Sequence, residues 1–193
     1  MSGLYALLVL GIWAGLTALI VRGWRRLLAR EDVPKLRVHA VFVPLLACWL
    51  GVTFWYGGGR KVYYDTLVNR MCKQDGGVKV YETVKLPADR FDKWGMVQPY
   101  DPTQKENALG AEYIYRSEDY FYRKGDPSMV RYRHQVLRRS DGKLLGETIS
   151  YGRGGGDLLG PWHPSSYHCP PTSESSEIAL FKMIFIPMGG RND

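Results

Sequence analysis

Two long apolar runs without charged side chains occupy most of the first 57 positions of the chain. The first extends from Met1 to Val21, and the second extends from Val38 to Tyr56 with His39 as its one side chain that could carry charge near pH 7. A helix of about 20 apolar residues crosses the hydrocarbon core of a bilayer. The pattern therefore predicts transmembrane helices at about residues 4–22 and 38–56, joined by a basic loop over residues 22–37.

The remainder of the chain, residues 58–193, is polar, and its boundary lies within three glycines at 57–59, which predict a flexible joint. Residues 60–72 place apolar side chains at helical spacing, so a short membrane-proximal amphipathic helix is expected to end near the turn at 75–77. From residue 78 onward the apolar positions alternate with period two, which is typical of strands.

This alternation predicts an antiparallel sheet. Strands are expected at 78–84, 113–116, 120–123, 130–139 and 144–151, with a bulge around 117–119, a tight hairpin turn at 140–143 and a long loop at 89–107. The almost continuous apolar run 178–186 is predicted to be a buried central strand. The fold class is therefore a two-helix transmembrane hairpin followed by a small α+β, mostly antiparallel β, extracytoplasmic domain.

The positive charge of the chain is concentrated between the two apolar runs. The whole chain has a net charge of +7, and residues 1–57 hold six basic and two acidic side chains, so more than half of the excess lies there. This distribution is typical of membrane topology rather than of a phosphate-binding groove, and it argues against nucleic-acid binding. We expect Arg22, Arg25, Arg26 and Arg30 to lie against anionic lipid headgroups.

Loops rich in Lys and Arg remain on the cytoplasmic side of a membrane. The basic loop 22–37 is therefore expected in the cytoplasm, with both termini and domain 58–193 in the periplasm. The first run lacks the basic n-region and clear cleavage site of a signal peptide, so it is interpreted as a retained helix. These observations predict a multi-pass protein of a bacterial inner membrane.

The three cysteines fit this location. Cys48 lies in the second apolar run, where it is interpreted as a small packing residue, whereas Cys72 and Cys169 both lie in the domain placed outside. Two cysteines in an oxidising compartment predict a disulfide. The alternative is a metal site that includes His163, His168 and Cys169, although their spacing matches no known ligand pattern.

Small residues four positions apart occur in both apolar runs, and they allow helices to approach closely. They are Gly11, Gly15 and Ala18 in the first run and Ala47 and Gly51 in the second. Two interpretations remain open: the two helices pack on each other, or this face binds a partner's helices or a second copy of the chain.

Tyrosine and arginine alternate in the predicted strands. Both residues are enriched at interface hot spots, and the candidates for partner binding are Tyr115, Tyr122, Arg131, Tyr132 and Arg133. The same alternation is also found in ordinary half-exposed sheets.

No catalytic motif or cofactor-binding pattern is present in the sequence. The glycine-rich segment 151–157 leads into Leu-Leu-Gly-Pro rather than into a helix, so it does not predict a nucleotide site. We therefore expect a non-enzymatic inner-membrane protein whose periplasmic domain binds a protein, as an accessory subunit of a secretion, pilus or phage-related envelope assembly or as a homo-oligomer. The alternatives are an envelope enzyme or metal protein and a glycan- or ligand-binding module.

Overall fold

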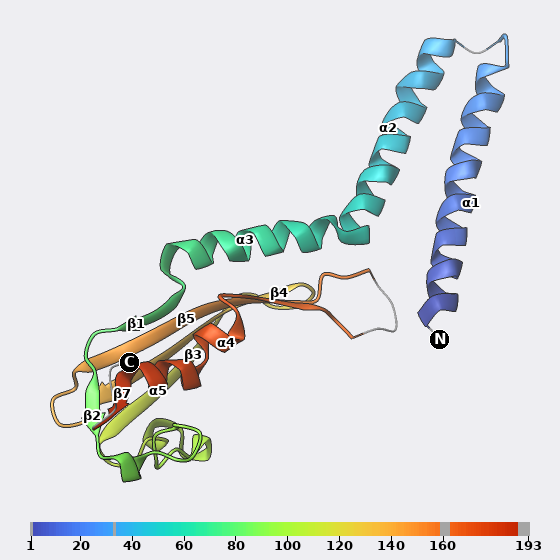
Figure 1. Cartoon of the computed structure of the whole chain (residues 1–193). Helices are drawn as coiled ribbons and strands as arrows, with labels where there is room; N and C mark the ends of the chain where they lie inside the picture. Colours follow the sequence, from blue (N-terminus) through green and yellow to red (C-terminus); the bar gives the residue numbers. More distant parts are fainter. Residues whose placement is uncertain (1, 33, 159–162, 189–193) are drawn as a thin grey trace. The chain divides into compact units, whose positions relative to one another are not determined.

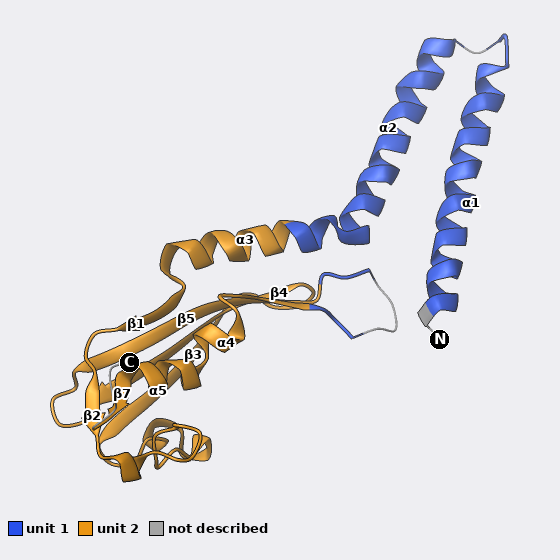
Figure 2. Cartoon of the chain, in the orientation of Figure 1, with its two compact units in different colours: residues 1–62, 156–165 blue, residues 63–155, 166–193 orange. Residues whose placement is uncertain are grey.

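The computed structural model of the chain describes residues 2–32, 34–158 and 163–188. They form two compact units, which Figure 2 shows in different colours. The first consists of Met1–Val62 and Gly156–Ser165, and the second of Tyr63–Gly155 and Ser166–Asp193.

The first unit contains helices α1 (Ser2–Leu28) and α2 (Lys35–Phe54) (Figure 1). The segments Gly3–Leu28 and Lys35–Asp75 are both long and apolar enough to cross a membrane. The prediction of two such helices is confirmed, and α1 extends beyond the predicted membrane-crossing part, which ends at about residue 22. It continues through three of the loop arginines because arginine favours helices and the first proline in this region is Pro34.

Helices α1 and α2 contact each other through aromatic and hydroxyl side chains. The indole nitrogen of Trp49 donates a hydrogen bond of 3.0 Å to Thr17 Oγ1. Nearer the interhelical turn, the ring of Trp24 stacks on Phe42 and meets the edge of His39.

The glycines expected to form a flexible joint instead belong to a wide helical turn, η1 (Trp55–Gly59). Gly58 has φ 155° and ψ −15°, which is not helical and produces a kink that glycine tolerates well. Helix α3 (Arg60–Asp75) follows directly, as the sequence predicted, and runs from the first unit into the second.

The second unit is built on an antiparallel sheet of five strands. Its order is β1 (Gly77–Val80), β5 (Leu144–Gly154), β4 (Ser128–Arg138) and β3 (Tyr113–Arg123), and β6 (Ser166–Cys169) pairs with the end of β5. Two short strands, β2 (Val84–Leu86) and β7 (Phe185–Pro187), form a separate parallel pair.

Helices pack on both faces of this sheet, and successive residues of β5 point to opposite faces. Thr148 donates a hydrogen bond to the carbonyl of Ser175 in α4 (Thr172–Ser175), whereas Ile149 packs in a cluster with Val68 of α3. We call these the α5 face and the α3 face, because α5 (Glu177–Ile184) directly follows α4 and contributes three buried residues to the core on its side.

The predicted strand 178–186 is wrong, because most of this run forms α5. Ser176 caps the helix by accepting a hydrogen bond from the backbone N–H of Ala179. Leu180, Phe181 and Ile184 are then all buried in the core, at the i, i+1 and i+4 positions that one helix face presents.

Two predictions about the strands also need correction. The expected strand 78–84 is divided into β1 and β2, which pair with different strands. The bulge in β3 lies at Tyr122 rather than around 117–119. Phe121 pairs with Val130 and Arg123 pairs with the adjacent Met129, so Tyr122 has no partner residue of its own in β4. Strand β6, helix α4 and the 3-10 turns Ala88–Arg90 and Pro102–Asn107 were not predicted.

Candidate functional site

Helix α3 is attached to the α3 face by a disulfide and by apolar packing. Cys72 of α3 and Cys169 of β6 form the disulfide, with their Cα atoms 5.9 Å apart. Beside it, Val68 is fully buried in a cluster with Ile149 and Tyr151 of β5. The structure therefore contains the predicted disulfide, and it joins two elements separated by 97 positions.

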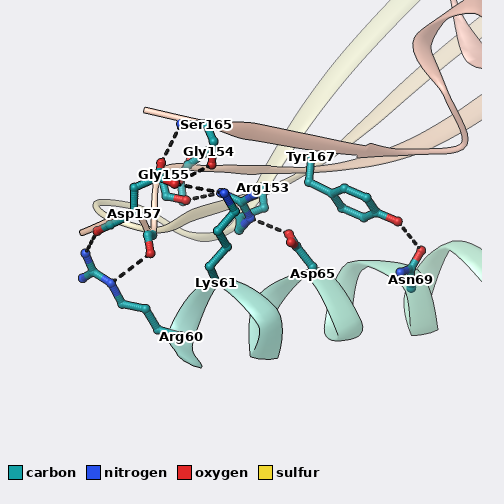
Figure 3. A network of polar contacts seen from close by, with 12 residues as sticks. Arg60, Lys61, Asp65, Asn69, Arg153, Gly154, Gly155, Asp157, Ser165 and Tyr167 are labelled. Atoms are coloured by element: carbon teal, nitrogen blue, oxygen red, sulfur yellow. Dashed lines mark hydrogen bonds and ion pairs between the residues drawn. The ribbon is translucent and has the colours of Figure 1, made fainter. Parts of the chain in front are cut away.

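Polar contacts along α3 add to this attachment (Figure 3). The Nε atom of Arg153, whose side chain is only 1% exposed, donates a hydrogen bond of 2.5 Å to Asp65. One turn further, Asn69 accepts a hydrogen bond of 2.7 Å from the hydroxyl of Tyr167. A guanidinium withdrawn from water is stable only when it is paired, so Asp65 has a structural role.

Asp75 makes the corresponding contacts at the last turn of α3. Its two carboxylate oxygens accept hydrogen bonds from the hydroxyl of Tyr151 at 2.6 Å and from Arg131 at 3.1 Å. Burial, and then the hydrogen bond to Asp75, raise the pKa of the Tyr151 hydroxyl, so Tyr151 is neutral and acts as a donor.

A second polar network lies within the first unit. Asp157 accepts hydrogen bonds from the side chain of Lys61, at 3.0 Å, and from the backbone and hydroxyl of Ser165. Burial opposes the ionisation of Asp157, but these hydrogen bonds outweigh it and lower the pKa of the carboxyl to about 2. Arg60 donates to the backbone carbonyls of Gly156 and Asp157. These contacts attach the segment after β5 to the first residues of α3, and Figure 3 shows the side chains that make them.

Strand β3 is the outer strand of the sheet, and β4 is its one neighbour among the described strands. Its last eight residues, Arg116–Arg123, are all exposed. Three of them are aromatic: Tyr120 is 61% exposed, Phe121 46% and Tyr122 48%. An open strand edge offers unpaired backbone groups to another strand, and adjacent aromatic rings add apolar contact area.

The structure does not bring the predicted partner-binding residues into one patch. Tyr122 lies on the exposed part of β3, whereas Tyr115 is buried beneath α5. Tyr132 lines a cavity on the α5 face. Arg131 and Arg133 are half-buried, and they pair with Asp75 and with Glu147 respectively. The neighbouring Tyr120 and Phe121 were missed, although they stand in the same aromatic run of the sequence as Tyr122.

A cavity of about 300 Å³ lies on the α5 face where α5 begins. Its lining includes Tyr132, His134, Ser150, His168, Thr172 and Glu177, from β4, β5, β6 and the two helices. One side of it is a hydrogen-bonded group, in which the Tyr115 hydroxyl lies 2.8 Å from His134 Nδ1 and 3.3 Å from a Glu177 oxygen.

Burial governs the protonation of this group. It lowers the pKa of His134, although the carboxylates of Glu177 and Asp119 act in the opposite direction. Burial and the hydrogen bond to Glu177 raise the pKa of Tyr100 to about 12, and burial also raises that of Tyr115. At neutral pH the cavity therefore presents an uncharged imidazole beside a carboxylate.

The alternative metal site loses one of its ligands in this structure. The sulfur of Cys169 is bonded to Cys72, so it is not available as a thiolate. His163 and His168 are exposed, and the ring of His168 stacks on Tyr132 with centroids 6.2 Å apart. Within the described residues, no group of three or more His, Cys, Asp or Glu side chains could hold a metal ion.

The small residues of the two apolar helices do not form the contact between them. Gly11, Gly15 and Gly51 have no described atom within 4 Å of the position that a Cβ would occupy, and Ala18 and Ala47 are exposed. Gly23 is the glycine that faces α2, with Phe42 at 3.7 Å. The face with Gly11 and Gly15 is therefore open in the described part of the chain.

The four arginines expected at lipid headgroups lie at the end of α1 and just beyond it. Arg22, Arg25 and Arg26 are on the helix, Arg30 follows it, and all four are exposed. Their side chains are therefore accessible to an anionic surface.

Comparison with protein-family models, with curated proteins and with solved structures finds no match to this chain.

Proposed function

We propose that the chain is a non-enzymatic protein of a bacterial inner membrane, whose extracytoplasmic sheet domain binds another protein along the edge of β3. The observation that carries this proposal is the exposed segment Arg116–Arg123, with three aromatic side chains, on a strand whose outer edge pairs with no other described strand. A partner strand would complete the backbone hydrogen bonds, and the aromatic rings would supply the apolar contact.

The proposed location rests on two features. Helices α1 and α2 are long and apolar enough to cross a membrane, and the basic residues between them favour the cytoplasm for the turn. The Cys72–Cys169 disulfide favours an oxidising compartment for the domain, which is the periplasm in a bacterium with two membranes. Both termini are then periplasmic, and a membrane-embedded envelope assembly (secretion, pilus or phage-related) or a second copy of the chain is the proposed partner.

Gentle detergent extraction of membranes followed by size separation tests the binding proposal. The wild-type chain is expected in a complex larger than itself, and Tyr120→Lys is expected to reduce the complex because charged residues on an open edge oppose strand pairing. Trp94→Lys is the matched control, since Trp94 is 71% exposed but lies in a turn outside the strands of the sheet. A wild-type protein that extracts alone as a monomer contradicts the proposal, and so does an equal effect of both substitutions.

A reporter fused after Asp193 tests the location. A reporter that is active only outside the cytoplasm is expected to be active, whereas activity of a cytoplasm-only reporter at this position would overturn the proposed topology.

A further inference from the structure

The cavity at the start of α5 has a chemical character that the proposed protein-binding edge does not explain. No Lys or Arg is among the described residues that line it, whereas the Glu177 carboxylate, several hydroxyls and the ring of Tyr132 are. The carboxylates of Glu177 and Asp119 are the charged groups that act on His134 within it. The local field therefore favours a positive charge over a negative one.

One lining side chain is largely buried, and its hydroxyl is open to the cavity rather than bonded within the described chain. Ser150 is only 8% exposed, and in the part of the chain that the structure describes its hydroxyl makes no hydrogen bond. By contrast, the hydroxyl of Ser175 donates to the carbonyls of Pro170 and Pro171, and the hydroxyl of Ser176 accepts from the backbone N–H of Ala179. A lining hydroxyl without a partner in the described chain can donate to or accept from a polar guest in the cavity.

We infer that this cavity binds a small aliphatic primary amine in its ammonium form. The ammonium group donates to Glu177 and to the hydroxyl of Ser150, and it lies near the ring of Tyr132, which attracts cations. A volume of about 300 Å³ is at the lower end of ligand cavities, so it admits one small molecule rather than a peptide.

The imidazole of His134 fits this assignment. Burial lowers its pKa, so it is neutral near pH 7 and does not repel a cation. An anion would meet the Glu177 carboxylate without a basic side chain to offset it in the described lining, and a neutral polyol would leave that carboxylate without a counter-charge.

Histidine NMR of the full-length protein in detergent micelles tests the inference directly. The chain has four histidines, so ring ¹³C labelling gives four signals, which histidine substitutions assign. The probes are ethanolamine, ethylene glycol and glycolate, which share a two-carbon hydroxyl frame and carry charges of about +1, 0 and −1 at neutral pH. Ethanolamine is expected to shift the His134 and His168 signals saturably, and those of His163 and His39 should stay in place.

Two substitutions and a control complete the test. Glu177→Gln is expected to weaken ethanolamine binding at least tenfold, and Ser150→Ala about threefold. Glu174→Gln, which removes an exposed carboxylate on α4 outside the cavity lining, should leave the affinity unchanged.

Three results would overturn the inference. They are no saturable shift with ethanolamine, an equal shift with ethylene glycol or glycolate, and undiminished binding in Glu177→Gln. If Glu177→Gln loses binding while its His163 and His39 signals stay in place, and Glu174→Gln binds as the wild type does, then the site has been lost rather than the fold.

Discussion

Replacing Asp65 with asparagine is expected to destabilise the domain strongly, because it removes the carboxylate that pairs with the buried guanidinium of Arg153. Removing one member of a buried ion pair costs about 3–5 kcal/mol in the free energy of unfolding. We expect about 3 kcal/mol here, at the lower end of that range. Asp65 itself is 26% exposed, and Arg153 retains a hydrogen bond to the carbonyl of Gly155. Thermal unfolding of the full chain in detergent should then show a midpoint lower by about 10 °C.

A double substitution separates the cost of burying Arg153 without the Asp65 carboxylate from the stabilisation that the pair provides. Arg153→Met should cost less than Asp65→Asn, since the remaining carboxylate can turn to water, and the double variant should be more stable than Asp65→Asn alone. Asp89→Asn, at an exposed position, is the control and should stay within about 0.5 kcal/mol of wild type. The reasoning is refuted if Asp65→Asn behaves like this control, or if the two single effects simply add.

Four further predictions concern the disulfide, pH, core packing and helix association. Cys72→Ser should lower the free energy of unfolding by about 4–5 kcal/mol, because the bridge closes a long loop, and the wild type alone should change mobility on reduction in a denaturing gel. Burial places the folded-state pKa of His134 below its unfolded value of about 6.5, so the unfolded chain takes up this proton first and stability should fall as pH drops below that value. His134→Gln should make the thermal midpoint less dependent on pH in this range. Gly146→Ala should destabilise by about 1–3 kcal/mol, measured by thermal unfolding, because the new Cβ would lie 2.9 Å from Ile184 and 3.0 Å from the carbonyl of Lys79. Gly15→Ile should leave the helical circular dichroism intact but reduce any oligomer seen by crosslinking in membranes, and an unchanged oligomer would exclude this face as its interface.

The local elements of the fold could be predicted from the sequence because their signals lie within a few residues. The hairpin between β4 and β5 is an example: Asp141 accepts a hydrogen bond from the backbone N–H of Lys143, and Gly142 has φ 69°. Turn chemistry of this kind needs no distant partner. The same holds for α3, whose apolar spacing and terminal glycines are visible in the chain.

Elements that depend on distant partners could not be predicted. The run 178–186 is apolar at almost every position, so neither a helical nor a strand period stands out, and burial beneath the sheet decides in favour of α5. The strand expected at 78–84 divides because the backbone N–H groups of Tyr81 and Glu82 both donate to the carbonyl of Leu145, which ends the pairing of β1.

The cavity illustrates the same limit for the candidate site. His134, Ser150, His168 and Glu177 are contributed by four elements, and no spacing in the sequence connects them. Tyr115 was a reasonable candidate for a partner surface, because its alternation with polar residues indicates a strand. Which face of that strand α5 would cover depends on tertiary packing.

The glycines of α1 show how the structure narrows two interpretations that the sequence left open. If Gly11 and Gly15 mediated packing within the hairpin, a Cβ at either position would meet α2, yet no described atom lies within 4 Å. The contact between the helices uses Thr17 and Trp49 instead. Close approach through glycines is favourable only where a neighbouring backbone uses the space. The glycine face is therefore open to a helix from another chain, and the Gly15→Ile substitution tests whether such a helix uses it.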